Sequence, residues 1–168
     1  DGARLLRPGS SIRRSDLYKH TAIYKIFCDS IDTTDPTTFA DALDLVRRIS
    51  NLTAGAPQIA YLVGWQHKGH DTGYPDVFTV NERLGGLNGL CKLMHEAQSL
   101  NTVVSFHDNY DDAYQEESGW DPELVARDMT GALARGGVWG NRQSYVINPW
   151  KYAQAAGKER IRRTLAMY

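Results

Sequence analysis

The sequence lacks several features that would place it in a specialised class. Its formal net charge is -1 over 168 residues, so no excess of positive charge favours nucleic acid or an anionic membrane as a partner. No apolar run approaches the length of a transmembrane helix, and residues 1–4 do not resemble a secretion signal. Two cysteines, Cys28 and Cys91, have no metal-ligand spacing, and the sequence does not decide whether they pair. We therefore expect neither nucleic-acid binding nor membrane insertion.

The residues that are present fit a single globular domain with a sizeable core. Hydrophobic residues make up 42% of the chain, and nine tyrosines and four tryptophans make it rich in aromatic side chains. In sugar-binding proteins such rings stack on the faces of pyranoses, although most aromatic residues in any domain belong to the core.

Three apolar runs alternate with helical patterns. Residues 21–28, 59–65 and 102–106 have the composition of buried strands. A helix is predicted after an N-cap at Asp35, and a second one after Gly85 and Gly86. Alternation of this kind predicts neighbouring parallel strands joined by right-handed crossovers.

The flanking segments are predicted with less regular structure. Residues 1–20 are basic and irregular, which indicates a linker or entry segment. A short helix is expected near residues 123–126, a loop at residues 136–140, and a last helix after Asn148 with a break at Gly157. The basic residues of that last helix are interpreted as its solvated face; they are Lys158, Arg160, Arg162 and Arg163.

Two α/β architectures fit this alternation. A complete doubly wound domain of this length would need about five strands, and only three are evident. The sequence therefore favours the N-terminal part of a (β/α)8 TIM-type barrel, with about three to four βα units in residues 21–168 and an incomplete barrel. We expect the barrel interior to be lined by some of Ile23, Phe27, Tyr61, Val63 and Val104.

Polar clusters follow two of the predicted strands. His70, Asp71 and Tyr74 follow the second strand, and a cluster that begins with His107 and Asn109 follows the third. Because the carboxyl ends of parallel strands meet at one edge of a sheet, both clusters should face the same opening.

Three interpretations of these clusters compete. Carboxylates, amides and imidazoles give directional hydrogen bonds to sugar hydroxyls, which favours carbohydrate binding. The histidines and aspartates are also acceptable ligands for a divalent metal, but no HExxH motif is present, so a metal-dependent hydrolase is less favoured and neither a metal nor another cofactor is expected. In the third interpretation, the polar groups only cap the strand ends.

Three segments carry a family resemblance. The order QIAYLVGWQHKGHDTGYPD, NERLGGLNGLCKLMHEAQSLNTVVSFHDN and QSYVIN resembles the catalytic barrel of the endo-α-N-acetylgalactosaminidases, glycoside hydrolase family 101. The resemblance covers roughly residues 21–165. It implies a secreted or cell-surface enzyme that cleaves galactose–N-acetylgalactosamine from O-glycoproteins, and it implies that substrate is bound by His70, Asp71, Tyr74, His107, Asn109 and Trp139.

The resemblance also implies a retaining mechanism with two carboxyl groups about 5 Å apart. It places the nucleophile at the end of a strand just beyond Tyr168, and the general acid on the strand after it. We therefore assign no catalytic pair in this chain, and we interpret the acids of residues 108–117 as site wall and loop surface. The alternative is a non-catalytic carbohydrate-binding or structural half-barrel.

Overall fold

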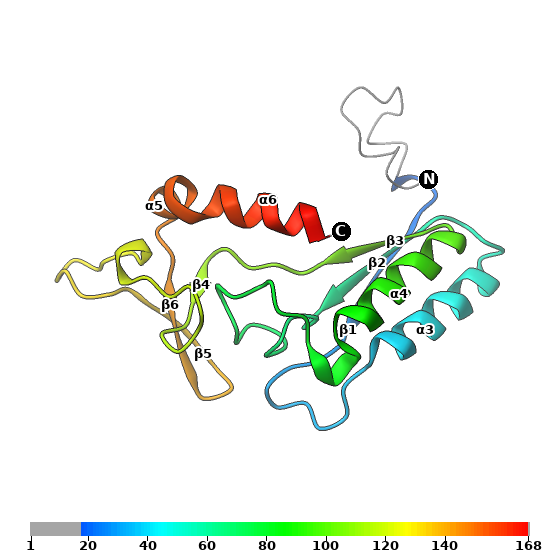
Figure 1. The fold of residues 1–168 in the computed structure, drawn as a ribbon, viewed down its shortest axis with the longest axis horizontal. Coiled ribbons are helices and arrows are strands. Elements are labelled where there is room, and N and C mark those ends of the chain that lie inside the picture. Colours follow the sequence, from blue (N-terminus) through cyan, green and yellow to red (C-terminus); the bar gives the residue numbers. More distant parts are fainter. Residues whose placement is uncertain (1–17, 168) are drawn as a thin grey trace.

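A three-stranded parallel sheet organises the fold. The computed structural model describes residues 18–167, so most of the predicted entry segment 1–20 lies outside the described part. The strands β1 (Ala22–Phe27), β2 (Gln58–Val63) and β3 (Thr102–Phe106) lie in the order β1-β2-β3, and both neighbouring pairs are parallel (Figure 1). The predicted neighbouring parallel strands are confirmed, with ends that differ by at most two residues.

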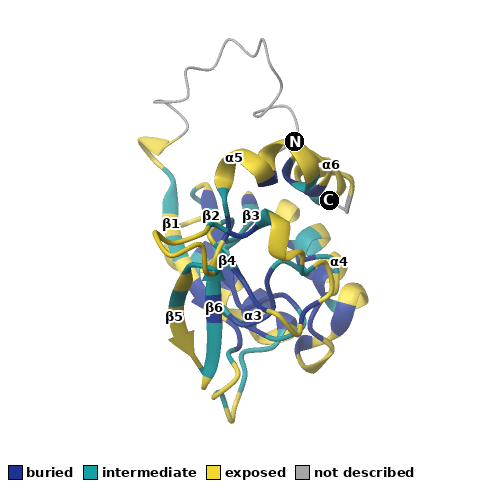
Figure 2. Ribbon diagram, turned by 90° about the vertical axis from the view of Figure 1, so that its left-hand side faces the viewer, coloured by how far each residue is buried: buried dark blue, intermediate teal, exposed yellow. Residues whose placement is uncertain are grey.

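Two helices join these strands and pack on one face of the sheet. Helix α3 (Phe39–Leu52) connects β1 to β2, and α4 (Gly86–Ser99) precedes β3 (Figure 1). The inward side chains of the strands and helices form one hydrophobic core, and its members include Ile26, Leu62, Phe39, Val46, Leu90 and Leu93. Figure 2 shows that the buried residues gather at the centre of the molecule, while the outer sides of the helices are exposed.

Helix α3 begins later than predicted. Thr38, not Asp35, is its N-cap, because the Thr38 hydroxyl accepts from the Asp41 amide at 3.2 Å while the Asp41 carboxylate accepts from the Thr38 amide at 3.0 Å. This reciprocal capping box satisfies two amides that would otherwise lack partners, so it fixes the helix start.

Within residues 18–167, the opposite face of the parallel sheet is open mainly along β1, while Val63, predicted for this face, is buried. The side chains of Ile23 and Phe27 are 57% and 46% exposed, and Tyr61 is half-buried. Val104 was predicted for the same face, but it pairs with Ala60 and packs against the core under the helices. Val104 is therefore not one of the side chains on this face, because side chains alternate between faces along a strand, and Phe106, two residues on, also packs into that core.

A second sheet follows β3. Strands β4 (Asp112–Ala113), β6 (Arg142–Val146) and β5 (Arg135–Trp139) form an antiparallel sheet in the order β4-β6-β5. Residues 136–140 were predicted as a loop, but most of them belong to β5. Gly140 and Asn141 both have positive φ, which is the geometry of a tight hairpin turn between β5 and β6.

The last helical segment is not uniform. Helix α5 (Pro149–Tyr152) begins at the predicted N-cap, where the Asn148 side chain accepts from the Lys151 amide at 3.0 Å. It passes through a π-helical turn, Ala153–Gly157, into α6 (Lys158–Met167), so the predicted break at Gly157 is a change of helix type. Along residues 18–167, no helix combines the length and apolarity needed to span a membrane.

Candidate functional site

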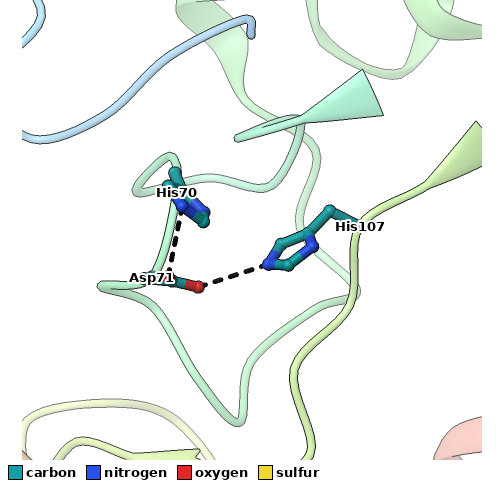
Figure 3. Close-up of side chains that lie close together, drawn as sticks. All are labelled: His70, Asp71 and His107. Atoms are coloured by element: carbon teal, nitrogen blue, oxygen red, sulfur yellow. Dashed lines mark hydrogen bonds and ion pairs between the residues drawn. The ribbon is translucent and has the colours of Figure 1, made fainter. Parts of the chain in front are cut away.

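Two histidines and an aspartate meet at the carboxyl ends of β2 and β3. Nε2 of His70 lies 3.2 Å from one carboxylate oxygen of Asp71, and Nε2 of His107 lies 3.4 Å from the other (Figure 3). All three side chains are partly exposed, with between 20% and 30% of each accessible. The predicted convergence of the two strand-end clusters is therefore confirmed for these residues.

The loop after β2 fixes His70 and Asp71 through its backbone. The His70 amide donates to the Asp29 carbonyl oxygen at 2.9 Å, which ties the loop to the end of β1. Asp71 has a left-handed backbone with φ of 54°, and its carbonyl oxygen accepts from the Tyr114 hydroxyl. Such a conformation is uncommon for a residue with a side chain, and aspartate tolerates it better than most.

His107 is held on three sides. Its amide donates to the Leu62 carbonyl at 2.8 Å, and its carbonyl accepts from the indole nitrogen of buried Trp65 at 2.8 Å. The ring nitrogen Nδ1 lies 2.7 Å from the Tyr61 hydroxyl. The result is a continuous polar chain from Tyr61 through His107 and Asp71 to His70.

The surroundings of His70 favour its neutral form. Burial lowers the pKa of His70 below its ordinary value; the Asp71 carboxylate opposes this, and the positive charges that His107 and Lys25 can carry add to it. A neutral imidazole offers one N–H donor and one nitrogen lone pair, so the cluster can both donate and accept hydrogen bonds.

Two of the predicted binding residues make contacts within the loops around the cluster. Tyr74 is fully buried beside Val77 and Tyr114, and its hydroxyl accepts from the Gln66 amide at 2.9 Å. Asn109 closes a turn: its amide donates to Asp112 at 2.7 Å, and its side-chain oxygen accepts from the Asp111 amide at 2.7 Å. Both side chains shape the loops around the cluster in this conformation.

Trp139 is the last residue of β5, beside the turn of the β5–β6 hairpin, and it is not one of the three clustered residues. Its side chain is 51% exposed. The tip leans on the loop after β1, because a methyl group on Gly140 would lie 2.0 Å from a side-chain carbon of Ile31. Arg142, which pairs with Trp139 beside the hairpin turn, attaches this end of the hairpin to the loop after β2, since its guanidinium donates to the Thr72 carbonyl oxygen.

The sequence of the chain matches one protein family over most of its length. The family model described as endo-alpha-N-acetylgalactosaminidase, glycoside hydrolase family 101, matches residues 13–166. The chain belongs to this family. The family resemblance carried by the three sequence segments is thereby confirmed.

Solved glycosidases share the fold of this family 101 chain. An α-N-acetylgalactosaminidase from Bifidobacterium bifidum has a TM-score of 0.70 at 19% identity, covering 88% of this chain and 24% of its own. An α-amylase from Lactobacillus plantarum (TM-score 0.60, 17% identity) covers 84% of this chain and 34% of its own. An α-galactosidase from Thermus thermophilus (TM-score 0.60, 15% identity) covers 89% and 31%. The chain thus spans about a quarter to a third of the length of these structures.

Two ionic networks support the site of this family 101 chain, and neither was predicted. Arg160 on α6 is 3% exposed; it pairs with Asp108 and donates to the Asn109 carbonyl at 2.8 Å. Glu117, with a side chain 2% exposed, pairs with Lys68 and Arg142, each at 2.5 Å. The interpretation of Arg160 as solvated was wrong. The position of Arg160 within a run of basic helical residues does not reveal a partner 52 residues earlier in the chain.

Proposed function

We propose that this chain forms the sugar-binding wall of a retaining glycoside hydrolase that acts on α-linked N-acetylgalactosamine. The substrate would be the galactose–N-acetylgalactosamine unit of O-glycoproteins. The observation that carries the proposal is the meeting of His70, Asp71 and His107 at one sheet edge. Membership of the endo-α-N-acetylgalactosaminidase family supports the same substrate class.

The cluster has the chemistry to hold sugar hydroxyls. The Asp71 carboxylate accepts hydrogen bonds from hydroxyl groups, and the two imidazoles can donate or accept beside it. Charge-assisted bonds of this kind are roughly twice as strong as those between neutral groups. The exposed indole of Trp139 can stack on a pyranose face. Tyr74 and Asn109 instead stabilise the loops around the cluster through their hydrogen bonds to Gln66 and Asp112.

The open face of the parallel sheet suits a larger closed sheet. We propose that β1, β2 and β3 are consecutive strands of a (β/α)8 barrel, with helices α3 and α4 in its outer ring. In that arrangement the face with Ile23 and Phe27 turns towards the barrel interior. Binding residues would then lie at the carboxyl ends of the strands, where barrel enzymes have their active sites.

The carboxylates beside the cluster are engaged elsewhere. Asp108 is bound by Arg160 and Glu117 by Lys68 and Arg142, while Asp29 accepts from Arg83 at 3.1 Å. Burial raises the pKa of Glu117, but hydrogen bonds from Lys68 and Arg142 outweigh this and hold it below its ordinary value, so Glu117 is a poor general acid. We therefore propose that the nucleophile and the acid come from other strands of the full-length protein.

The same engaged carboxylates favour a second candidate, a carbohydrate-binding module without catalysis. One assay distinguishes a glycoside hydrolase from a carbohydrate-binding module without catalysis. An aryl α-glycoside of galactose–N-acetylgalactosamine, incubated with the full-length protein, releases its phenol only if the protein is an enzyme. If the protein binds the disaccharide but releases no phenol from the aryl glycoside, it is a carbohydrate-binding module and not an enzyme.

The role of Asp71 can be tested in the same assay. Asp71→Asn keeps the size of the side chain and removes its charge, so we expect kcat/KM to fall by about 10- to 100-fold, as for a lost charge-assisted hydrogen bond of about 1.5–3 kcal/mol. Asp44→Asn, on the exposed side of α3, is the matched control and should leave kcat/KM unchanged. Equal activity of the two variants would remove Asp71 from the binding site.

A location outside the cell, either secreted or on the cell surface, is part of the proposal. It follows from the substrate, because O-glycans of glycoproteins are displayed extracellularly. Immunodetection of the protein in culture medium and on intact cells tests this directly.

A further inference from the structure

The His70–Asp71–His107 cluster also contains the donor atoms of a transition-metal site. One ligand atom from each residue lies within 4.8 Å of the other two (Figure 3). Two imidazoles and a carboxylate, with positions left open to solvent, are a donor set that zinc and its neighbours in the first transition row accept. The partial exposure of the three side chains gives an ion a path to the site.

The distances nearly match those of an occupied site. Zinc bonds of about 2.0–2.1 Å in a tetrahedron place ligand atoms about 3.3 Å apart. The two histidine–aspartate separations, 3.2 and 3.4 Å, are close to this value, but they end on different oxygens of the Asp71 carboxylate, so binding through one oxygen requires the carboxylate to shift between the two rings. The two imidazoles would need to approach by at most about 1.5 Å, starting from a separation within 4.8 Å.

The surrounding contacts orient the ligands. The Tyr61 hydroxyl lies 2.7 Å from Nδ1 of His107, so it can fix the ring with Nε2 directed at the ion. A partner of this kind on the far nitrogen of a ligating histidine is a common feature of metal sites. Hydrogen bonds from Tyr114 to the Asp71 carbonyl and from the His70 amide to Asp29 hold the other two backbones.

We propose that His70, Asp71 and His107 bind a divalent transition-metal ion of the zinc class, and that this ion excludes sugar from the same residues. The exclusion of sugar rests on the proposed function, whereas the binding of metal does not. Magnesium and calcium prefer oxygen ligands throughout, so these ions should not occupy a site with two imidazoles.

Metal binding is measured directly on the full-length protein after treatment with a chelator. Calorimetric titration with Zn²⁺ should give a site that is weakened at least tenfold by His70→Ala, by His107→Ala and by the shape-conserving Asp71→Asn. His95→Ala, on the exposed side of α4, is the control and should bind as the parent does. Tyr61→Phe should weaken zinc binding by about 10- to 100-fold through loss of the outer contact.

Two further readouts make the result specific. Co²⁺ should give the visible absorption of a four- or five-coordinate ion, and this absorption should be absent in His107→Ala. Circular dichroism shows whether each variant is folded. Zinc affinity that is unchanged in the folded His70→Ala and His107→Ala variants would overturn the metal site.

Competition with sugar separates the two proposals. Saturating Zn²⁺ should raise the Kd for the disaccharide at least tenfold, and Mg²⁺ should not. If zinc binding depends on the histidines but leaves the sugar Kd unchanged, the exclusion is wrong and sugar binds elsewhere. If zinc binds as expected and no glycoside or disaccharide is bound at all, the proposed function fails while the metal site stands.

Discussion

Arg160 connects the last helix to the end of β3. Its guanidinium pairs with Asp108, lies 3.3 Å from the Tyr152 hydroxyl, and sits 4.0 Å above the ring of Tyr110. A charge this deeply buried is tolerated because a carboxylate and aromatic faces surround it. Since Asp108 follows His107 directly, Arg160 also steadies the segment that presents the histidine.

Replacing Arg160 should therefore destabilise the protein strongly. In Arg160→Met the Asp108 carboxylate loses its partner, and we expect a loss of about 3–5 kcal/mol in the free energy of unfolding. Arg162→Met is the matched control; its partner Glu159 is exposed, so the loss should be about 1 kcal/mol or less. Urea unfolding of both variants measures the difference, and similar midpoints would contradict the assignment.

Glu117 should make the stability sensitive to acid. Burial alone raises its pKa, but hydrogen bonds from Lys68 and Arg142 outweigh this and hold the pKa below its ordinary value. Stabilisation by a carboxylate with a lowered pKa is complete above the unfolded value of about 4.3 and is lost as the pH falls through the folded value.

The corresponding measurement is the melting temperature below pH 5. Glu117→Gln should show a shallower decline of melting temperature with falling pH than the parent protein, because it has no carboxylate to protonate at this position. Glu116→Gln, whose side chain is 66% exposed, should decline as the parent does. Parallel curves for the parent and Glu117→Gln would refute the prediction.

At the residue scale, long-range topology was easier to predict than local chemistry. The meeting of Asp71 with His107 followed from the rule that parallel strands end at one edge. The turn-closing bonds of Asn109 could not be predicted, because an asparagine after a strand has the same pattern whether it binds a ligand or closes a turn. Arg160 was missed for a related reason, since its partner lies on another element.

Among the elements, the turn after β2 is the most constrained. Gly64 has φ of +77°, and a methyl group there would lie 1.9 Å from the carbonyl oxygen of Asp29. That carbonyl also accepts from the His70 amide, so the close approach of the two backbones positions the site loop. Only glycine combines this conformation with this contact.

Gly64→Ala should disrupt this turn. Gly55 has nearly the same φ, +76°, but no atom lies near its missing side chain, so Gly55→Ala adds only the strain of a left-handed alanine, about 1 kcal/mol. We expect Gly64→Ala to lose at least twice as much, because backbone atoms must also move. Denaturant unfolding compares the two, and equal losses would contradict the close packing.

The elements themselves were predicted unevenly. The strands of the parallel sheet were identified by continuous apolar runs, and their ends were nearly right. Strand β5 was missed because Gly136 and Gly137 weaken any strand pattern, and its pairing with β6 comes from a tight turn at Gly140 and Asn141. The start of α3 is set by the Thr38–Asp41 capping box, whose residue pattern is visible in the sequence, and not by the Asp35-Pro36 pair.

At the scale of the whole molecule, the uncovered face of the parallel sheet should govern solubility. Ile23 is 57% exposed there, and Val103 is partly exposed on the same face. Apolar side chains beside an open strand edge favour association. We therefore expect the 168-residue chain by itself to bind the dye ANS, to aggregate readily and to lack glycosidase activity.

Substitution on this face tests the cause. Ile23→Thr with Val103→Thr keeps β-branched residues in the strands, so it should lower ANS fluorescence and aggregation measured by light scattering. Leu52→Thr removes an 86% exposed leucine at the end of α3 and should change neither. If the two variants behave alike, exposure in general is responsible and the sheet face has no special role.

The π-helical turn at Ala153–Gly157 sets the rotational phase of α6. A π-turn holds one residue more than the α-helical turn it replaces, and each residue of an α-helix advances the chain by about 100° around the axis. Without that extra residue, the α6 side chains would point about 100° away from their present directions. Arg160 would then face away from Asp108 and from the side chains of Tyr110 and Tyr152. A change of one residue in the length of this turn would therefore have to be matched by a shift of the buried arginine along the helix.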